Sequence, residues 1–170
     1  MNPTRITIPP PTIIVDTREQ CPLEFLNLPT EPGTLQAGDY SVRGLEHLIG
    51  IERKSLADLV GCFGNERERF EREMVRLQSR RFRAVVVEAT YADLEAGEWR
   101  SKILPQVVTG SVASWSMRYG TPFFFCGDAC ATARFTERLL FHAARHIAWE
   151  FSNATAFIQE GKGTQLEVVA

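Results

Sequence analysis

Short apolar runs alternate with amphipathic segments along this chain, and the alternation predicts strands interleaved with helices. The first run, at 12–15, is β-branched and ends at Asp16, which is typical of a strand. Two later runs, 34–42 and 48–54, flank a five-residue connection that contains a glycine, so they predict a β-hairpin. The complete set of predicted strands is 12–15, 34–42, 48–54, 81–88 and 122–126.

The predicted helices carry apolar residues at helical spacing. A short helix begins at Ser55, because Ser55 and Asp58 have the spacing of a capping box. The next helix has Phe70, Met74 and Leu77 at i, i+4 and i+7, which is one apolar stripe. Two longer helices are predicted at 103–119 and 128–149.

This order of elements predicts an α/β sandwich, with a largely parallel sheet, an early antiparallel pair and helices on both faces. Residues 1–11 hold four of the nine prolines and are expected to form an extended arm. The stretch at 20–33 contains three prolines and a glycine, so it is expected to be a loop. One domain is expected over 12–150, followed by a strand or tail at 151–170.

Composition narrows the class of protein. A length of 170 residues suits one domain, and 44% hydrophobic and 24% charged residues are ordinary globular values. The net charge of −2 excludes nucleic-acid binding through bulk positive charge, so any such binding needs a local basic patch. The sequence has neither an apolar run of the roughly 18 residues that a membrane span needs nor a secretory signal. We therefore expect a soluble, cytoplasmic protein with no membrane partner.

The predicted hairpin brings together residues suited to metal-assisted hydrolysis. Side chains alternate along a strand, so Glu52 and Lys54 share one face, and Asp39 falls opposite a residue near position 51 or 52. Two carboxylates beside a lysine can hold Mg²⁺ or Mn²⁺ and activate water against a phosphodiester. The alternative is a solvated strand end with no chemistry, and a register slip of one residue would separate Asp39 from the pair.

A third acidic position ends the first predicted strand. The sequence there reads Asp16-Thr17-Arg18-Glu19, so acidic and basic groups gather at the carboxyl end of a strand, where ligands bind in open α/β sheets. The alternative is that Asp16 only starts a turn, which aspartate favours.

The predicted second helix carries a local basic patch. Residues 66–83 include seven arginines and four glutamates. Arginine suits phosphate well, and phosphate contacts make affinity salt-dependent. The alternative is a solvated helix stabilised by pairs such as Glu68 with Arg72. The arginines expected to share one helix face, and to contact DNA, are Arg69, Arg72, Arg76 and Arg80.

Three segments together resemble the nuclease domain of the XPF family of structure-specific DNA endonucleases. They are Asp16-x-Arg18-Glu19, Gly38-Asp39-Tyr40 and Ile51-Glu52-Arg53-Lys54-Ser55-Leu56-Ala57-Asp58. The family is marked by Gly-Asp followed by Glu-Arg-Lys-x-x-x-Asp, and the resemblance covers about residues 12–150. It implies a restriction-endonuclease-like fold, which is a three-layer sandwich with a mixed central sheet.

The resemblance also implies roles for individual residues. The implied metal ligands, for Mg²⁺ or Mn²⁺, are Asp16, Asp39 and Glu52. Lys54 would assist the attacking water, and Arg53 would contact phosphate or support the acidic cluster. Arg18 and Glu19 match the family as well and are expected in the site, Arg18 as a DNA contact. Asp58 matches the last signature position, but its place in the capping box explains it equally well.

The activity implied by the resemblance is metal-dependent cleavage of branched, flap or fork DNA in repair or recombination. Family members commonly carry a tandem helix-hairpin-helix module after the nuclease domain, and the roughly twenty residues after Glu150 are too few for one. The grip on DNA would then come from this domain, from a homodimer or from a DNA-binding partner. The alternative function is a non-catalytic DNA-binding or scaffolding subunit, although none of the signature positions is missing.

Overall fold

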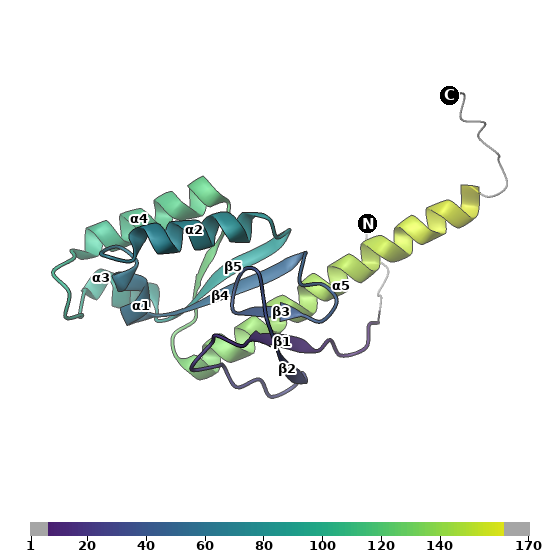
Figure 1. Ribbon diagram of the computed structural model, residues 1–170, viewed down its shortest axis with the longest axis horizontal. Coiled ribbons are helices and arrows are strands. Elements are labelled where there is room, and N and C mark those ends of the chain that lie inside the picture. Colours follow the sequence, from purple (N-terminus) through teal and green to yellow (C-terminus); the bar gives the residue numbers. More distant parts are fainter. Residues whose placement is uncertain (1–6, 162–170) are drawn as a thin grey trace, which may run out of the picture.

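The computed structural model describes residues 7–161, which form a six-stranded sheet with helices on both faces (Figure 1). The strands are β1 (Ile13–Asp16), β2 (Thr30–Gly33), β3 (Tyr40–Val42), β4 (Ile49–Ser55), β5 (Phe82–Glu88) and β6 (Phe123–Phe125). Their order across the sheet is β2-β1-β3-β4-β5-β6. Strand β3 runs antiparallel to both β1 and β4, whereas the other neighbouring pairs are parallel. The sheet is therefore mixed, as predicted.

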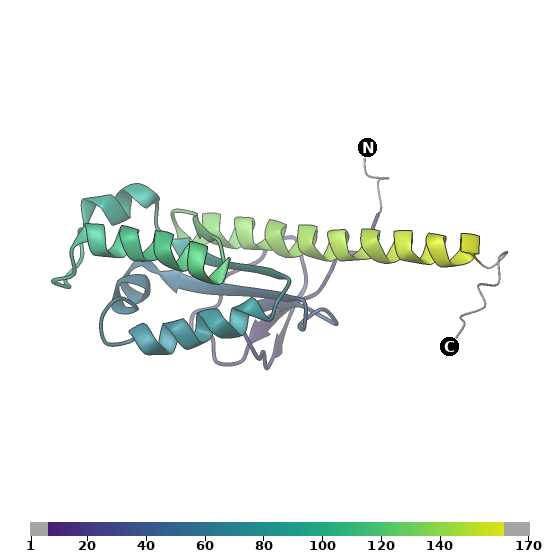
Figure 2. The same ribbon diagram turned by 90° about the horizontal axis from the view of Figure 1, so that it is seen from above.

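The helices form the two outer layers. They are α1 (Leu56–Gly61), α2 (Arg67–Gln78), α3 (Tyr91–Ala96), α4 (Pro105–Tyr119) and α5 (Ala129–Gly161). Helices α1, α2 and α4 lie on one side of the sheet with α3 beside them, and α5 lies on the other side (Figures 1 and 2). The predicted three-layer α/β sandwich is confirmed. No helix among the described residues is both long enough and apolar enough to cross a membrane.

The core is divided by the sheet because successive side chains of β5 point to opposite faces. Val85 and Val87 pack in the cluster that includes Met74 of α2 and Trp115 of α4. Val86 packs on the opposite side, in the cluster that includes Leu140 of α5. Burial on both faces explains why the middle of β5 is a continuous apolar run.

The first strands differ from the prediction at two points. Strand β2 lies within the predicted loop 20–33, because Pro32 is tolerated in an edge strand that needs few backbone donors. The strand predicted at 34–42 is shortened to β3, because the backbone N–H of Leu35 donates to the Asp16 side chain rather than to a neighbouring strand. The antiparallel hairpin of β3 and β4 itself is confirmed.

The helices differ as well. Helix α3 was not predicted, although Thr90 and Asp93 form a capping box and Gly97 ends the helix in a left-handed conformation. The prediction of a strand or tail at 151–170 is wrong for 151–161, because α5 continues to Gly161 without an interrupting proline or glycine. Residues 162–170 lie outside the described part of the chain. Of the predicted arm, residues 7–11 have no regular structure, and residues 1–6 are likewise outside it.

Candidate active site

The β3–β4 hairpin fixes the position of Asp39 relative to Glu52. Tyr40 pairs with Ile51 in the antiparallel ladder, and the backbone N–H of Asp39 donates to the Ile51 carbonyl at 2.8 Å. Gly38 has a φ of +78°, and a Cβ atom there would lie 2.9 Å from the Ile51 carbonyl oxygen, so only glycine fits this close approach. This register brings Asp39 across from the position 51–52 region, in line with the expected pairing.

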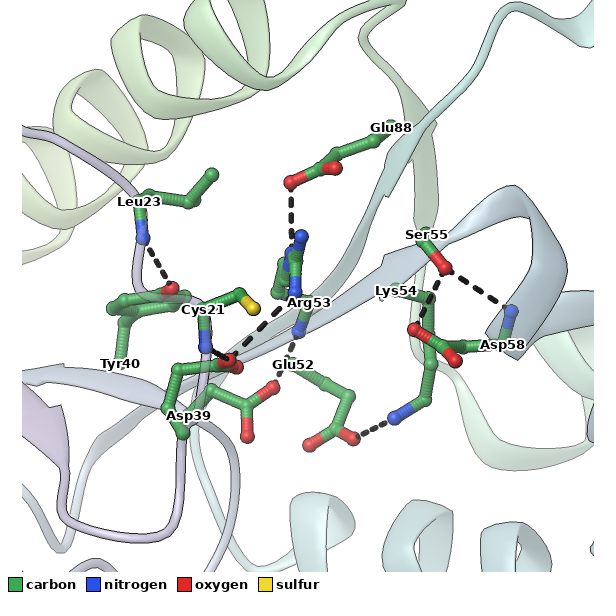
Figure 3. A network of polar contacts seen from close by, with 11 residues as sticks. Cys21, Leu23, Asp39, Tyr40, Glu52, Arg53, Lys54, Ser55, Asp58 and Glu88 are labelled. Carbon is green, nitrogen blue, oxygen red and sulfur yellow. Dashed lines mark hydrogen bonds and ion pairs between the residues drawn. The ribbon is translucent and has the colours of Figure 1, made fainter.

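A common space lies at the open end of the β3–β4 hairpin, away from its turn. The side chains of Asp39, Glu52 and Lys54 face this space (Figure 3). The carboxylate of Asp39 accepts a hydrogen bond from the backbone N–H of Arg53 at 2.8 Å. Glu52 is 4% exposed, and its Oε1 accepts from Lys54 Nζ at 2.5 Å. The Lys54 ammonium also lies 5.3 Å from the ring centroid of Phe70 on α2, which holds the cation over an aromatic face.

The surroundings of Asp39 and Glu52 disfavour the charged forms of their carboxyl groups. Burial raises the pKa of Glu52 above its usual range, and the nearby charge of Asp39 raises it further. Burial also raises the pKa of Asp39, against the hydrogen bond from the Arg53 amide. Burial alone would lower the pKa of Lys54, but the charge of Glu52 outweighs it, so Lys54 stays an ammonium. A cation beside Asp39 and Glu52 would relieve the repulsion between them.

The carboxylate of Asp16 forms an ion pair with Arg18. Its Oδ1 accepts from Arg18 Nε at 2.7 Å, and its Oδ2 accepts from Arg18 Nη2 at 3.0 Å and from the Leu35 backbone N–H at 2.7 Å. Burial would raise the pKa of Asp16, but these hydrogen bonds outweigh it and lower the pKa. Within residues 7–161 no three acidic, histidine or cysteine side chains gather as a metal site. Asp16 lines the same cavity as Asp39 and Glu52 while its carboxylate is hydrogen-bonded to Arg18, and the expected set of three carboxylate ligands stays a prediction.

Arg53 lies between two carboxylates on the other face of β4. Its Nε donates to Glu88 at 2.7 Å, and its Nη1 lies 3.6 Å from Glu19. Figure 3 shows the guanidinium reaching toward Glu88 while Glu52 and Lys54 point the opposite way. This placement follows from strand alternation and pairs the Arg53 guanidinium with two carboxylates.

Asp58 has the capping geometry that its spacing predicts. Its backbone N–H donates to the Ser55 hydroxyl at 3.1 Å, and that hydroxyl donates to Asp58 Oδ2 at 2.7 Å. The side chain also borders the cavity at the end of the hairpin. Capping α1 is thus an observed role of Asp58.

These side chains line a cavity of about 450 Å³. Its wall includes seven carboxylates but only four basic side chains, so the cavity favours a cation. Of the residues expected in the site, the cavity brings together Asp16, Arg18, Glu19, Asp39, Glu52, Arg53, Lys54, Asp58 and Arg69.

The arginines of α2 divide into two groups. Arg69, Arg72 and Arg76 project from the helix, each paired with a nearby glutamate at 3.4, 3.9 and 2.5 Å. Exposed pairs of this kind contribute little to stability and exchange readily for another anion. Arg80 does not extend this face, because α2 ends at Gln78 and the Arg80 side chain is 7% exposed. The expected run of four arginines is therefore a run of three.

Three carboxylates at or beside the site were not predicted, and one of them, Glu66, borders the cavity directly before α2. Glu88 ends β5 and holds Arg53, and Glu73 borders the cavity from α2, where its charge raises the pKa of both Asp39 and Glu52. Glu88 follows a buried apolar run, so the strand-end argument applied to Asp16 would also have identified it. Glu73 has no comparable signal, since it looks like any polar residue on an amphipathic helix.

Comparison with known proteins agrees with this arrangement. The sequence matches the model of the ERCC4 domain over residues 15–139. The structure is similar to XPF from Aeropyrum pernix, with a TM-score of 0.64 and 23% identity, over 78% of this chain and 61% of that chain. It is equally similar to the structure titled XPF from Aeropyrum pernix in complex with DNA, with a TM-score of 0.64 and 23% identity, over 79% and 66% of the two chains.

The chain spans less than two thirds of the length of either solved chain. No curated protein sequence matches it significantly. The structural likeness confirms the restriction-endonuclease-like fold. Since the matched domain model extends over well more than half of the sequence and includes the whole hairpin, the chain belongs to the ERCC4-domain family, as an XPF-type nuclease domain.

Proposed function

We propose that this chain is a divalent-cation-dependent DNA endonuclease that cuts one strand beside a branch, flap or fork. The observation that carries the proposal is the convergence of Asp39, Glu52 and Lys54 on one acidic cavity. The family supports nuclease activity, and the Aeropyrum pernix protein solved with DNA supports DNA as the substrate. A nuclease with such a substrate would act in DNA repair or recombination.

The donor set fits Mg²⁺ or Mn²⁺. Asp39 and Glu52 offer carboxylate oxygens, which these hard cations prefer. Their pKa values are raised because their surroundings disfavour the charged forms, and a bound cation would stabilise those charged forms. We assign the cation to Asp39 and Glu52, and we assign Asp16 to anchoring Arg18 at the cavity wall. When bound, such a cation polarises a phosphoryl oxygen and lowers the pKa of its water.

The protein's own groups would complete the chemistry. Lys54 keeps its ammonium beside Glu52, so it can orient the attacking water and offset charge on the phosphate as the bond breaks. Arg53 holds the hairpin end between Glu19 and Glu88, which keeps the carboxylates in place. Glu52 and Lys54 would therefore take part in the reaction on one face of the sheet, and Arg53 would hold the carboxylates in place from the other face.

The grip on DNA would come from arginines around the cavity. Arg18 pairs with Asp16 but leaves 68% of its side chain exposed, and Arg69, Arg72 and Arg76 are exposed along α2. Three or four phosphate contacts give weak, salt-dependent binding. A second copy of the chain or a DNA-binding partner would add the remaining grip.

A cleavage assay tests the proposal. The purified chain is incubated with flap, fork, splayed-arm and linear duplex DNA in Mn²⁺, Mg²⁺ or EDTA. We expect metal-dependent nicks near the branch, and loss of at least about a hundredfold in rate for Asp39→Asn or Glu52→Gln. Glu98→Gln, at an exposed position away from the cavity, is the matched control. Unchanged cutting by the two cavity variants would reject the mechanism, and cation-independent binding without cutting would favour a non-catalytic subunit.

A further inference from the structure

A row of basic side chains follows one side of α5. Its members are exposed and recur at every fourth position, namely Arg134, Arg138, His142 and His146. Residues four apart are neighbours on a helix surface, so the row is continuous. At 1.5 Å of rise per residue it is about 18 Å long from its first member to its last.

The two arginines of this row have no acidic partner. Among residues 7–161, neither Arg134 nor Arg138 takes part in an ion pair. Glu137, which lies between them in the sequence, is 7% exposed, and its carboxylate accepts hydrogen bonds from the backbone amides at 27–28. The exposed arginines of α2, in contrast, each have a glutamate nearby. The α5 arginines are therefore available to an anion from outside the chain.

Two cavities lie between this row and the edge strand β6. Arg134 and Arg138 border one, of about 300 Å³, and His142 and His146 border the other, of about 440 Å³. Phe124 of β6 borders both, so together they form one groove, which we call the α5 groove. Of the described residues, none that borders this groove is acidic. The groove therefore favours an anionic ligand.

Aromatic rings lie along the groove between the basic side chains. Phe124 contacts Phe135 of α5 edge to face, with ring centroids 5.1 Å apart, and both rings are only partly buried. Toward the other end, Phe82 is also partly buried, and the guanidinium of Arg81, which pairs with Glu150, lies 5.1 Å from its ring centroid. Cations and aromatic rings in one groove are typical of single-strand binding, because phosphates contact the cations while unpaired bases stack on the rings.

The α5 groove begins near the candidate active site. Arg134 also borders a cavity that reaches Arg53 and Glu88, at the ends of β4 and β5. From there α5 runs back along the sheet (Figure 2), and the pair between Arg81 and Glu150 joins its far part to the start of β5. A strand lying in the groove would thus lead away from the acidic cavity.

We propose that the α5 groove binds the unpaired DNA strand that leaves the branch. Its phosphates contact Arg134 and Arg138, and its bases lie against Phe124 and Phe135. The row has room for about five nucleotides at about 3.4 Å each. The inference rests on the proposed function, which supplies the branched substrate. It explains a preference for branches, because a fully paired duplex offers no free base to the rings.

Binding measurements in EDTA separate this inference from cutting. Fluorescence anisotropy compares a single-stranded oligothymidine, a linear duplex and a fork with unpaired arms at several salt concentrations. Arg134→Ala/Arg138→Ala removes the two cations, and Arg134→Lys/Arg138→Lys keeps their charge. Arg43→Ala/Arg100→Ala is the matched control, because both residues are exposed and border neither the groove nor the acidic cavity. Phe124→Leu removes an aromatic face and keeps an apolar side chain.

We expect the double alanine variant to bind the oligothymidine and the fork at least about tenfold more weakly than the wild type. Its slope of log affinity against log salt should fall by about 1.4, or about 0.7 for each lost contact with a single strand. The double lysine variant should keep the slope. Phe124→Leu should weaken binding about tenfold with the slope unchanged, because stacking is not ionic. Binding of the linear duplex should be the same for all these proteins.

Equal losses on duplex and single strand would overturn the inference, because the two arginines would then belong to a general phosphate-binding surface. It would also be overturned if the wild type did not bind the oligothymidine, or if the double alanine variant bound it normally. The proposed function fails separately. Single-strand binding that depends on the α5 groove, without any cutting in Mn²⁺ or Mg²⁺, would support the groove and reject the endonuclease.

Discussion

The carboxylate of Asp39 accepts a hydrogen bond at 2.8 Å from the backbone N–H of Arg53, across the hairpin from it. The bond ties the end of β3 to β4 at the point where Glu52 and Lys54 turn into the cavity. It also favours the charged form of Asp39, yet burial outweighs it and the pKa of Asp39 remains raised. The fold therefore holds two carboxylates where their charge destabilises it, which is the usual condition of a site built for a cation.

Replacing Asp39 with Asn should stabilise the metal-free protein at neutral pH. The folded-state pKa values of Asp39 and Glu52 lie above those of the unfolded chain. The free energy of unfolding therefore falls as the pH rises from about 4 through the raised values. Asn removes one charge and keeps an oxygen for the Arg53 amide. We expect a gain of about 1 kcal/mol at pH 7, or about 2–4 °C in Tm.

Thermal melts of both proteins in EDTA check this expectation at pH 7 and at about pH 4, where the unfolded carboxyl groups become protonated and the gain should vanish. Equal melting temperatures at pH 7 would contradict it.

Divalent cations should stabilise the wild-type protein. A ligand that binds only the folded state adds about 2.7 kcal/mol at a hundredfold excess over its Kd, which is a Tm rise of several degrees. Mn²⁺ or Mg²⁺ in the melt measures this rise, with NaCl of equal ionic strength as control. Glu52→Gln and Asp39→Asn should lose most of it. A rise of the same size in both variants would place the cation elsewhere.

Replacing Asp16 with Asn should have the opposite effect from replacing Asp39. The pKa of Asp16 is lowered by hydrogen bonds from Arg18 and Leu35. Its contribution to stability is therefore present above the unfolded pKa of about 4 and is lost as the pH falls through the lowered folded value. We expect Asp16→Asn to cost about 2 kcal/mol at neutral pH, since hydrogen bonds to a charged group are broken.

Urea unfolding at pH 7 measures this loss for Asp16→Asn. Glu98→Gln, at an exposed position, should lie within about 0.5 kcal/mol of the wild type. If Asp16→Asn instead stabilised the protein, the charge of Asp16 would destabilise the fold, as the charges of Asp39 and Glu52 do.

Removing Arg69 or Arg72 should weaken DNA binding uniformly across sequences. Each exposed arginine that contacts a phosphate contributes about one unit to the slope of log affinity against log salt. We expect each change to Ala to lower that slope by about one, measured by fluorescence anisotropy at several salt concentrations. Arg100→Ala, in the exposed connection between α3 and α4, is the control and should leave the slope unchanged. Slopes that match the wild type would remove α2 from the DNA-binding surface.

The hairpin could be predicted from sequence because its evidence is local. Side-chain alternation places Glu52 and Lys54 on one face whatever the rest of the fold does, and the Gly38-Asp39 pair marks the close approach to β4. The contacts of the hairpin residues with other strands could not be predicted in this way. The contact of Arg53 with Glu88 joins positions 35 residues apart, and only the parallel pairing of β4 with β5 brings them together.

The remaining differences also arise from tertiary contacts. The hydrogen bond from the Leu35 amide to the Asp16 carboxylate joins positions 19 residues apart and leaves no pattern in the sequence. Arg80 fits a helical spacing that α2 does not continue. The far end of α5 was not recognised because its apolar residues have no sheet to cover, so their spacing lost the periodicity that marks a packed helix.

The far end of α5 has a practical consequence. At 1.5 Å per residue the helix is about 50 Å long, and its C-terminal part projects past the sheet (Figures 1 and 2). Phe151 and Phe157 are 71% and 77% exposed in this part of the helix. It extends to the opposite side of the molecule from α1, the helix that directly follows β4 (Figure 1). Once the exposed Cys21 and Cys130 are replaced by serine, a cysteine placed at Phe157 could carry a dye or a surface tether without crowding the acidic cavity, which Cys21 lines. Single-molecule observation of this domain on DNA could therefore be built on that extension.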